Sequence, residues 1–457
     1  MQQKSELPEG WTLTELPSVA FFQEGPGLRK FQFCDDGIPF LNIRTMVNER
    51  IDLSKCKYLN PSEVQAKYGH FLLDEDDLIL SSSGSIGKTA RICKEDLPLM
   101  LNTSVIRFRT LNKNILSNDF LYLFLKSDFL YKQIESMKTG TAQYNFGPTH
   151  LKQMLFSLPP LAEQHSIVKA TGVLFARLDA INEKLGRVPE ILKTFRQAVL
   201  VAACDGGLTE SWRLSNSIDK STNWKWQNIS EIGVVSGGLI KNQKRMMYSL
   251  SLPYLRVANV YANRLDLSEI KEIGVLENEL SRFLLQEGDL LVVEGNGSID
   301  QIGRVALWDG SISPCIHQNH IIKVRFYQGI YNRYVLYWLL SPIGRDKIVQ
   351  SSSSTSGLNT LSISKVGQLP IPVPPLPEQQ EIVRRVDALF AFADSVEAKV
   401  AAAREKTERL RQSILAKAFS GKLVPTEAEI ARQEGRGYES AGELVGRIGK
   451  EGKVSAK

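Results

Sequence analysis

A repeat with a fixed interval of 215 residues constrains this chain more than any other feature of its sequence. A segment containing two prolines, a leucine and a Glu-Gln pair occurs twice, and an Arg-Gln pair follows each copy. Around these landmarks about 16 of roughly 46 aligned positions are identical without a gap, which indicates one structural module written twice. The repeated polar landmarks are Glu163, Gln164, Arg196 and Gln197 in the first copy, and Glu378, Gln379, Arg411 and Gln412 in the second.

The two copies are less alike before each of these uniform segments. Pro39–Arg44 resembles Pro253–Ala258, and the turn Gly84–Lys88 resembles Gly297–Arg304. The interval drifts here between about 212 and 216 residues, so loops of different length are expected. The sequence therefore predicts five parts with a pseudo-two-fold internal repeat. They are a first variable domain (1–157), a first helical segment (158–210), a second variable domain (211–372), a second helical segment (373–425) and a charged tail (426–457).

Both uniform segments carry the heptad pattern of long helices. Apolar residues recur every three or four positions from Ile167 to Ala202 and from Ile382 to Ile414. Each pattern stops near a glycine, and about 40 residues at ~1.5 Å each give a rod of roughly 60 Å. The two stripes could bury each other as an antiparallel coiled coil, or each helix could pack on its own domain. Pro189 predicts a kink or a local split in the first helix.

Each variable domain is predicted to be a small α/β or α+β domain with a modest sheet. Short apolar runs bounded by turns are typical of strands, and one longer amphipathic run follows them in each copy. The predicted strands are 38–43, 78–82 and 104–108 in the first copy, and 254–257, 290–293 and 321–326 in the second. The predicted helices are 120–136 and 331–349. The tail is predicted to be a short helix with a flexible end that lacks a counterpart in the first copy.

Composition narrows the class of protein. A chain of 457 residues is too long for one core, and its 43% hydrophobic and 23% charged residues are ordinary for a globular protein. Five widely spaced cysteines favour a reducing compartment over a disulfide framework. We expect neither a signal peptide nor a membrane helix. The net charge of +6 is compatible with a polyanionic partner without requiring one.

Three motifs that could indicate chemistry are incomplete. Ser82–Thr89 resembles a phosphate-binding loop, but Ser82 replaces its first glycine. Cys315–His320 offers metal-ligand types that the first copy lacks, and a strand alternation explains them more simply. Glu397 and Lys399 have a nuclease-like spacing but lie within the second heptad pattern. The sequence therefore predicts neither a catalytic nor a metal-binding residue.

The two Pro-Pro-Leu-x-Glu-Gln segments carry a family resemblance, together with the Arg-Gln helix ends, the openings 7–11 and 223–226 and the Gly-Ser-Ile-Gly-Lys turn. On these motifs residues 5–425 resemble the specificity subunit of type I restriction–modification enzymes. The resemblance implies two target-recognition domains that each recognise half of a split DNA sequence, separated by two antiparallel helices. It also implies a complex with two modification subunits and two restriction/translocase subunits, which the cysteine usage would place in the cytoplasm. S-adenosylmethionine, ATP and Mg²⁺ would bind to those partners, and this chain would bind no cofactor.

Residues for both kinds of contact follow from this interpretation. The eight repeated landmarks are the predicted partner-binding residues. Polar and basic turns are the predicted double-stranded DNA contacts, although a solvated loop explains each of them equally well. The candidates are Arg29, Lys30, Arg44, Lys88, Lys138, Gln143 and Tyr144 in the first variable domain, and Lys241, Lys244, Arg245, Arg256, Arg304, Ser353 and Asn359 in the second. The alternatives are a coiled-coil scaffold that never binds DNA and a degenerate stand-alone DNA methyltransferase.

Overall fold

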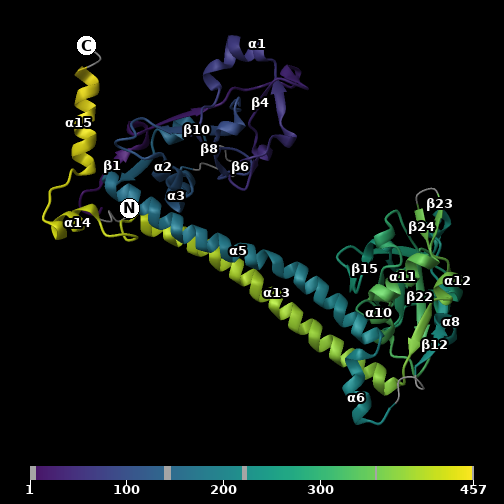
Figure 1. Ribbon diagram of the computed structural model, residues 1–457. Coiled ribbons are helices and arrows are strands. Elements are labelled where there is room, and N and C mark those ends of the chain that lie inside the picture. Colours follow the sequence, from purple (N-terminus) through teal and green to yellow (C-terminus); the bar gives the residue numbers. More distant parts are fainter. Residues whose placement is uncertain (1–6, 138–145, 219–223, 356–357, 455–457) are drawn as a thin grey trace. The chain divides into compact units, whose positions relative to one another are not determined.

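The computed structural model describes residues 7–137, 146–218, 224–355 and 358–454. Its internal contacts divide the chain into two units (Figure 1). The first unit joins Met1–Leu185 to Ala402–Lys457, and the second unit is Gly186–Ala401. Each unit therefore contains one variable domain and part of each long helix. Among the described residues, no helix is both long and apolar enough to cross a membrane.

The centre of each variable domain is a four-stranded antiparallel sheet, and equivalent strands have the same order in both. In the first unit the order is β2 (Ala20–Glu24), β10 (Val105–Thr110), β8 (Leu78–Ser81) and β9 (Thr89–Arg91). In the second unit it is β13 (Gly233–Gly237), β22 (Ile321–Phe326), β18 (Leu290–Val293) and β20 (Val305–Leu307). The strands predicted at 78–82, 104–108, 290–293 and 321–326 are confirmed.

Each variable domain also carries a smaller three-stranded sheet, called here its outer lobe. The first outer lobe contains β3 (Phe33–Cys34), β7 (Lys57–Leu59) and β4 (Ile38–Phe40), and the second contains β17 (Lys271–Val275), β14 (Leu250–Leu255) and β21 (Ile316–His317). The strand predicted at 38–43 ends at Phe40 because the Asn42 side chain accepts a hydrogen bond from the Arg44 amide and caps a turn. The strand predicted at 254–257 begins earlier and ends at Leu255.

Shorter strands complete both domains. They are the pairs β1 (Thr12–Glu15) with β11 (Leu155–Leu158), β12 (Lys225–Asn228) with β25 (Pro370–Val373), β5 (Met46–Val47) with β6 (Arg50–Ile51) and β15 (Val260–Tyr261) with β16 (Arg264–Leu265), and the sheet β19 (Gly295–Asn296), β24 (Leu358–Thr360) and β23 (Ser353–Thr355). The short helices are α1 (Pro61–Glu63), α4 (Pro148–Leu151), α6 (Glu210–Ser215), α8 (Ile229–Ile232), α9 (Leu280–Phe283) and α12 (Ile363–Gly367).

The single helix predicted in each domain is in fact two helices. They are α2 (Asn118–Leu125) with α3 (Asp128–Ser136), and α10 (Asn332–Leu340) with α11 (Pro342–Ser351). Ser127 and Ser341 interrupt the pattern because each side chain accepts a hydrogen bond from an amide of the following first turn. Pro342 then occupies the first helical position, where its missing amide proton costs little.

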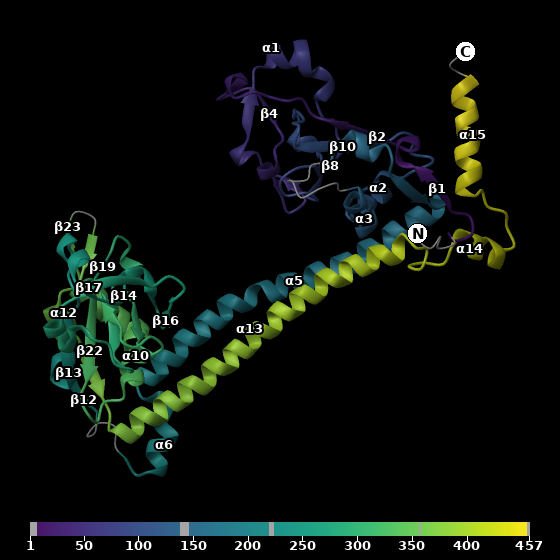
Figure 2. The ribbon, with the colours of Figure 1, turned by 180° about the vertical axis from the view of Figure 1, so that it is seen from behind.

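The heptad segments form α5 (Leu161–Cys204) and α13 (Leu376–Ala418), which lie side by side and antiparallel (Figures 1 and 2). In the first unit the Thr407 hydroxyl lies 2.7 Å from Asn182 Oδ1. In the second unit an Arg196 guanidinium nitrogen lies 2.6 Å from Asp394 Oδ1. The two helices therefore pack on each other, which confirms the predicted fold class of two α/β domains joined by an antiparallel coiled coil. Helix α5 is unbroken at Pro189, so the predicted local split does not occur.

The buried stripe drifts around the helices in the first unit. Ile181 and Leu410, both predicted on the stripe, are 46% and 43% exposed. Phe175 and Leu415, which the strict pattern omits, are buried. An α-helix has 3.6 residues per turn, so a 3.5-residue stripe rotates out of a contact between helices that do not supercoil enough to compensate.

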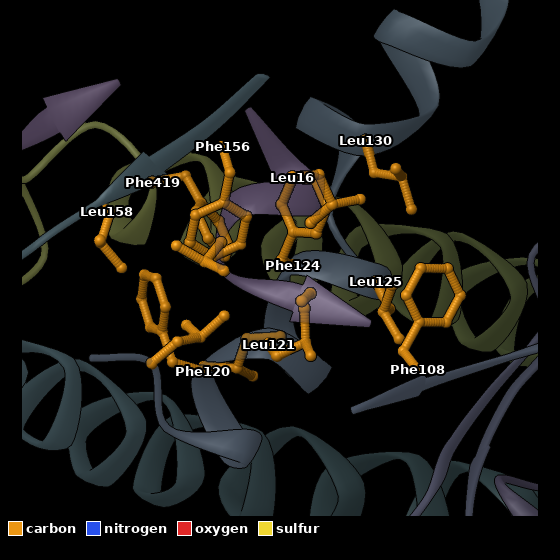
Figure 3. Close-up of a cluster of buried hydrophobic side chains, with 14 of the residues drawn as sticks. Leu16, Phe108, Phe120, Leu121, Phe124, Leu125, Leu130, Phe156, Leu158 and Phe419 are labelled. Atoms are coloured by element: carbon orange, nitrogen blue, oxygen red, sulfur yellow. The ribbon is translucent and has the colours of Figure 1, made fainter. Parts of the chain in front are cut away.

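The first unit has an aromatic core that joins its domain to the end of α13 (Figure 3). The ring centroid of Phe419, which follows α13, lies 5.0 Å from Phe120 and 6.0 Å from Phe124. The tail also contributes, since Leu444 is buried in this core. The tail forms two helices, α14 (Glu427–Glu434) and α15 (Ala441–Val454), where one short helix was predicted.

Candidate nucleic-acid interface

A buried glutamate at the start of each long helix fixes the edge of its variable domain. Glu163 Oε1 accepts a hydrogen bond of 2.9 Å from the Trp11 indole, and Glu378 Oε2 accepts one of 2.8 Å from the Trp224 indole. Both glutamates are at most 1% exposed. The same tryptophan–glutamate contact therefore holds each domain on the helix that follows it.

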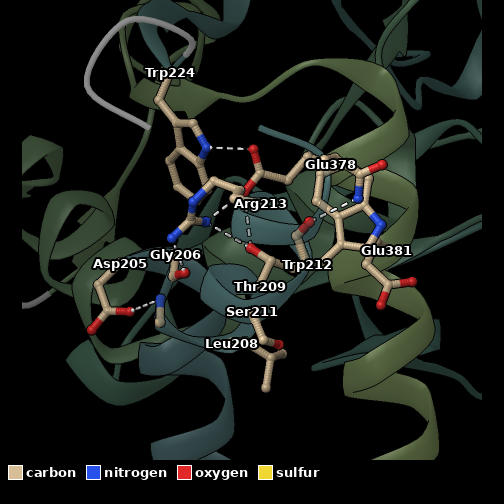
Figure 4. Close-up of polar contacts among 12 residues, drawn as sticks. Asp205, Gly206, Leu208, Thr209, Ser211, Trp212, Arg213, Trp224, Glu378 and Glu381 are labelled. Atoms are coloured by element: carbon tan, nitrogen blue, oxygen red, sulfur yellow. Dashed lines mark hydrogen bonds and ion pairs between the residues drawn. The ribbon is translucent and has the colours of Figure 1, made fainter. Parts of the chain in front are cut away.

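The remaining partners of the two glutamates differ. Glu378 Oε1 accepts from Arg213 at 2.6 Å and from the Thr209 hydroxyl at 2.8 Å (Figure 4). Glu163 Oε2 accepts instead from the backbone amide of Glu427 at 3.0 Å. Desolvation by burial raises the pKa of Glu163, although the hydrogen bonds from Glu427 and Trp11 oppose it.

The neighbouring glutamines repeat an identical set of bonds. Gln164 accepts from the Ser117 amide at 2.8 Å, and Gln379 accepts from the Tyr331 amide at 2.8 Å. Each side-chain amide also donates to two carbonyl oxygens of its own unit. The repetition of Glu163, Gln164, Glu378 and Gln379 is explained by these internal bonds, because all four are buried. Partner binding by these residues stays a prediction.

The four other landmarks lie on the long helices. Arg196 pairs with Asp394 at 2.6 Å and with Glu397 at 2.9 Å. At the equivalent place Arg411 pairs with Asp179, and its guanidinium lies 4.6 Å from the centroid of the Phe175 ring. Gln197 is exposed and Gln412 is half-buried. These pairs hold the helices together within each unit, and their predicted contact with partner subunits stays a prediction.

The predicted DNA contacts Arg29, Lys30 and Arg44 in the first variable domain are exposed. Lys88 is exposed too, but its Nζ donates to the carbonyl oxygens of Ile43 and Met46 at 3.2 Å each. Its ammonium therefore ties the glycine turn to the turn that carries Arg44. The other predicted contacts, Lys138, Gln143 and Tyr144, lie outside the described residues.

The second variable domain repeats this tie. Arg304 donates to the carbonyl oxygen of Val257 at 3.3 Å and lies over the Tyr261 ring at 5.2 Å from its centroid. Lys88 and Arg304 occupy the same place in their turns, so the cation has a structural role in both domains. A phosphate contact would have to compete with these carbonyl bonds.

Four basic candidates of the second variable domain differ in how free they are. Arg256 is half-buried and bonds to the carbonyl oxygen and the carboxylate of Glu269 at 3.0 Å and 3.4 Å. Lys241 and Lys244 are exposed, whereas Arg245 is 8% exposed. Arg245 forms a two-pronged pair with Glu279, with both distances at 2.9 Å. Its hydrogen bonds lower the pKa of Glu279 to about 2. We therefore remove Arg245 from the set of free phosphate contacts, because its guanidinium nitrogens already bond within the domain.

The structure brings the glycine turn of the second domain together with the serine-rich segment that carries the predicted contacts Ser353 and Asn359. Strand β19 precedes the turn and pairs with β24, so Asn296 lies opposite Asn359. Ser353 of β23 lies opposite Thr360 of β24, and the Ser353 hydroxyl accepts a hydrogen bond from Lys365 Nζ at 2.8 Å. Ser353 and Asn359 are thus placed in one small sheet beside the turn.

The first domain has a corresponding junction. The backbone amide of Phe146 donates to the Ser82 carbonyl oxygen at 3.2 Å, and the Leu361 amide donates to the Glu294 carbonyl oxygen at 2.7 Å. In both units the described chain that follows the predicted contacts therefore lies beside the strand end that leads into the glycine turn. These two places beside the glycine turns are therefore the strongest candidates for a surface that contacts DNA bases.

Two buried carboxylates with structural roles were not predicted from the sequence. Asp77 and Asp289 are at most 2% exposed and pair with Arg109 and Arg325 of the adjacent strand. The signal was present, since both copies place an aspartate before one strand and an arginine at the end of the next. Their pairing requires knowledge of which strands are neighbours.

The metal-ligand types around Cys315 have a structural explanation. His317 is fully buried, and its Nδ1 lies 2.9 Å from the carbonyl oxygen of Ile321. Burial lowers its pKa to about 4, which keeps the imidazole neutral. Among the described residues, no three His, Cys, Asp or Glu side chains are grouped so that they could hold a metal ion.

Comparison with known protein families gives one match in each copy of the repeat. The family described as "Type I restriction modification DNA specificity domain" matches twice, at residues 8–188 and 221–403. The chain belongs to this family. It is 31% identical over 431 residues to the type I restriction enzyme EcoKI specificity subunit of Escherichia coli K12, covering 92% of this chain and 90% of that protein. It is 30% identical over 427 residues to the StySPI specificity subunit of Salmonella potsdam, covering 92% and 91%.

Solved structures agree on the fold of this type I specificity subunit. The HsdS subunit from Thermoanaerobacter tengcongensis matches with a TM-score of 0.56 at 18% identity, over 92% of this chain and 99% of that one. A chain from a study of complex assembly and conformational transition of a type I restriction–modification system matches with a TM-score of 0.60 at 18% identity, over 92% and 100%. The chain is therefore a specificity subunit with two DNA specificity domains.

Proposed function

We propose that each variable domain recognises one half of a bipartite, asymmetric DNA sequence. The observation that carries this proposal is the unequal conservation of the two copies. Their central sheets and tryptophan–glutamate contacts are equivalent, whereas their outer lobes and loops carry different side chains. Equivalent central sheets would let both domains approach DNA in the same way. Different side chains on the outer lobes and loops would let them recognise different bases.

The two long helices would set the spacing between the half-sites. Helix α5 has 44 residues and α13 has 43, and each passes from one unit to the other. A helix rises by about 1.5 Å per residue, so a pair of this length is a rod of roughly 65 Å. The number of unspecified base pairs between the half-sites would follow from this length.

The chain itself would not be a catalyst. In this proposal it recruits two modification subunits that methylate adenine N6 and two restriction/translocase subunits. S-adenosylmethionine, ATP and Mg²⁺ would bind to those partners in the cytoplasm, and this chain would bind none of them. Because a methyltransferase must extrude its target base, the specificity subunit has only to hold the duplex and present the site.

Sequencing of adenine methylation across the genome of a host carrying this protein tests the proposal. The expected result is one bipartite motif with a fixed gap. A palindromic motif without a gap, or no motif, would contradict it. Replacing residues 1–157 with those of another family member should change one half-site only.

Two further experiments separate the alternatives. Deleting one heptad from α5 and the matching heptad from α13 should shorten or abolish the permitted gap while both half-sites stay the same. The purified chain alone, incubated with DNA and labelled S-adenosylmethionine, should transfer no methyl group. Transfer would favour a stand-alone methyltransferase, and an absence of salt-sensitive duplex binding with all partners present would favour a scaffold.

A further inference from the structure

The second outer lobe contains a cavity of about 380 Å³ with a strongly cationic wall. It lies between β14, β17 and the turn that begins at Asn242. Glu272 is the carboxylate among the lining residues, so the basic residues outnumber it. The lining residues used below are Lys241, Arg245, Tyr254, Arg256 and Lys271.

Two polar atoms on this wall have no hydrogen-bond partner among the described residues: Tyr254 Oη and Arg256 Nε. Tyr254 is 3% exposed, and desolvation by burial raises its pKa, so its hydroxyl remains a proton donor. A buried donor without a partner is costly, and native proteins contain few of them. Such donors beside a cavity are available to a ligand that accepts hydrogen bonds.

The basic residues divide into two arginines that bond within the lobe and two lysines with exposed ends. The Arg256 guanidinium donates to the Glu269 carbonyl oxygen at 3.0 Å and pairs with its carboxylate at 3.4 Å, and its buried Nε stays unpaired among the described residues. Arg245 bonds to Glu279 and to the Ile240 carbonyl oxygen at 2.8 Å. Lys241 and Lys271 are exposed. The Lys271 ammonium lies 3.6 Å from an exposed Glu269 carboxylate, a contact that contributes little. The lysines can therefore turn toward an anion without breaking a buried bond.

The first outer lobe lacks these donors at equivalent positions. Phe40 and Tyr254 precede a shared leucine, and Asn42 and Arg256 follow it. The strand pairings agree, because Phe40 bridges Met100 as Tyr254 bridges Ile316. In the first lobe the rings of Phe40 and Phe33 lie 5.1 Å apart, and the Asn42 side chain caps its own turn. The hydroxyl and the guanidinium are therefore specific to the second domain.

We propose that this cavity binds one phosphate group of the DNA backbone at the half-site recognised by the second variable domain. The inference rests on the proposed DNA recognition and adds a specific anchor to it. A phosphodiester offers oxygen acceptors to Tyr254 Oη and Arg256 Nε and a negative charge to Lys241 and Lys271. The first domain would hold its half-site without this anchor.

A methylphosphonate scan tests the anchor. The full-length chain, purified with its modification subunits, is titrated with duplexes in which one phosphate at a time is made neutral. One linkage at the second half-site should lower the affinity of the wild-type complex about tenfold. Lys271→Ala should lower the affinity for unmodified DNA by a similar factor, and the neutral linkage should then cost no more than about twofold.

Two matched variants sharpen the result. Lys225→Ala removes an exposed lysine of the second unit that is neither on the cavity wall nor among the predicted DNA contacts, and it should leave the cost of the neutral linkage unchanged. Tyr254→Phe introduces the residue type of the first copy. It should weaken DNA binding at the same linkage about threefold to tenfold without lowering the thermal stability of the free chain, because it removes an unpaired buried hydroxyl.

The outcomes distinguish this inference from the proposed function. If the complex binds its bipartite site but no linkage couples to Lys271 or Tyr254, the phosphate anchor is wrong and the proposed function stands. If it binds no specific site, the proposed function fails first. Two further outcomes would overturn a DNA phosphate as the occupant. One is that inorganic phosphate binds the free chain while no DNA linkage couples to the cavity. The other is that Lys271→Ala loses the modification subunits.

Discussion

The glutamates at the starts of α5 and α13 occupy equivalent places, but different chain segments close over them. Glu378 is covered by Thr209 and Arg213, which follow α5 in the sequence. Glu163 is covered by the amide of Glu427, which follows α13. In each unit the segment after one long helix therefore closes on the start of the other. The expectation that the tail lacks a counterpart is wrong, because its beginning is the counterpart of residues 206–215.

This difference also separates an ionic contact from a neutral one. Arg213 is 7% exposed and Glu378 is fully buried, so the second unit contains a buried ion pair. The first unit satisfies Glu163 with an indole and a backbone amide. Two solutions to the same burial problem should respond differently to substitution, pH and salt.

The largest effect is expected from Glu378→Ala. It leaves the Arg213 guanidinium buried without its carboxylate, which costs about 3–5 kcal/mol. Glu163→Ala removes only hydrogen bonds to neutral donors and should cost about 1–3 kcal/mol. Hydrogen exchange of each unit measures the two losses separately. Glu381→Ala, which removes a half-buried neighbour paired within its own helix, is the control, and equal losses at positions 163 and 378 would contradict the comparison.

The next largest effect is the loss of stability of the second unit at acidic pH. His317 lies where the first domain has Leu101, since Gln318 and Asn102 accept equivalent amide bonds from Ile321 and Val105. Burial lowers the folded-state pKa of His317 to about 4. His317 therefore does not lower the stability of the second unit above about pH 6.5. As the pH falls toward 4, the unfolded chain binds a proton that the folded unit does not, and the second unit loses about 2 kcal/mol of folding free energy by pH 5.

Pulse proteolysis in urea at pH 7 and pH 5 checks this expectation. His317→Leu, which introduces the first domain's residue type, should reduce the acid sensitivity of the second unit by that amount. His320→Asn, at an exposed position, should leave it unchanged. An unchanged acid response in His317→Leu would show that the acid-sensitive group lies elsewhere.

Local patterns predicted much of the fold. The heptad stripes, the glycine stops and the central strands follow from periodicity, and Gly206 and Gly421 do adopt positive φ angles of 78° and 67°. The splits at Ser127 and Ser341 were predictable in principle from a serine before an acidic residue or a proline. They were missed because the apolar pattern continues across both breaks.

Tertiary contacts explain the remaining differences. The repeated Glu-Gln pairs stand out in the sequence, but their burial depends on a tryptophan about 150 residues away in the chain. Lys88 and Arg304 resemble phosphate contacts until the carbonyl oxygens beside them are placed. Tyr254 and Lys271 become a candidate site only when β14 and β17 pair, which puts them opposite each other.

A smaller effect is expected from the arginines between the helices. Arg411 pairs with Asp179 with its side chain 16% exposed and lies over the Phe175 ring, whereas Arg196 is 29% exposed and pairs with two exposed carboxylates. Arg411→Ala should destabilise the first unit by about 1–2 kcal/mol through lost ring contact. Arg196→Ala should cost the second unit at most about 1 kcal/mol.

Hydrogen exchange at 50 mM and 500 mM salt separates the two contributions. The loss in Arg196→Ala should shrink at high salt, because exposed ion pairs are screened. The loss in Arg411→Ala should change little, and Arg411→Met should recover part of it by restoring contact with the ring. A loss that is equally salt-sensitive in both variants would contradict the contrast.

The smallest effect is expected at a polar pair between the helices that the first unit has and the second unit lacks. Thr407 lies 2.7 Å from Asn182 Oδ1 in the first unit, and the repeat places the buried Leu192 and the ion-paired Glu397 at these positions in the second. Thr407→Val keeps the shape of the side chain and removes one hydrogen bond, so it should cost less than about 1 kcal/mol. Thr407→Val combined with Asn182→Leu should recover that loss, because both partners then become apolar. A cost above about 2 kcal/mol for Thr407→Val that the double change did not recover would contradict this expectation. The polar pair would then be a main stabilising contact between the helices of the first unit.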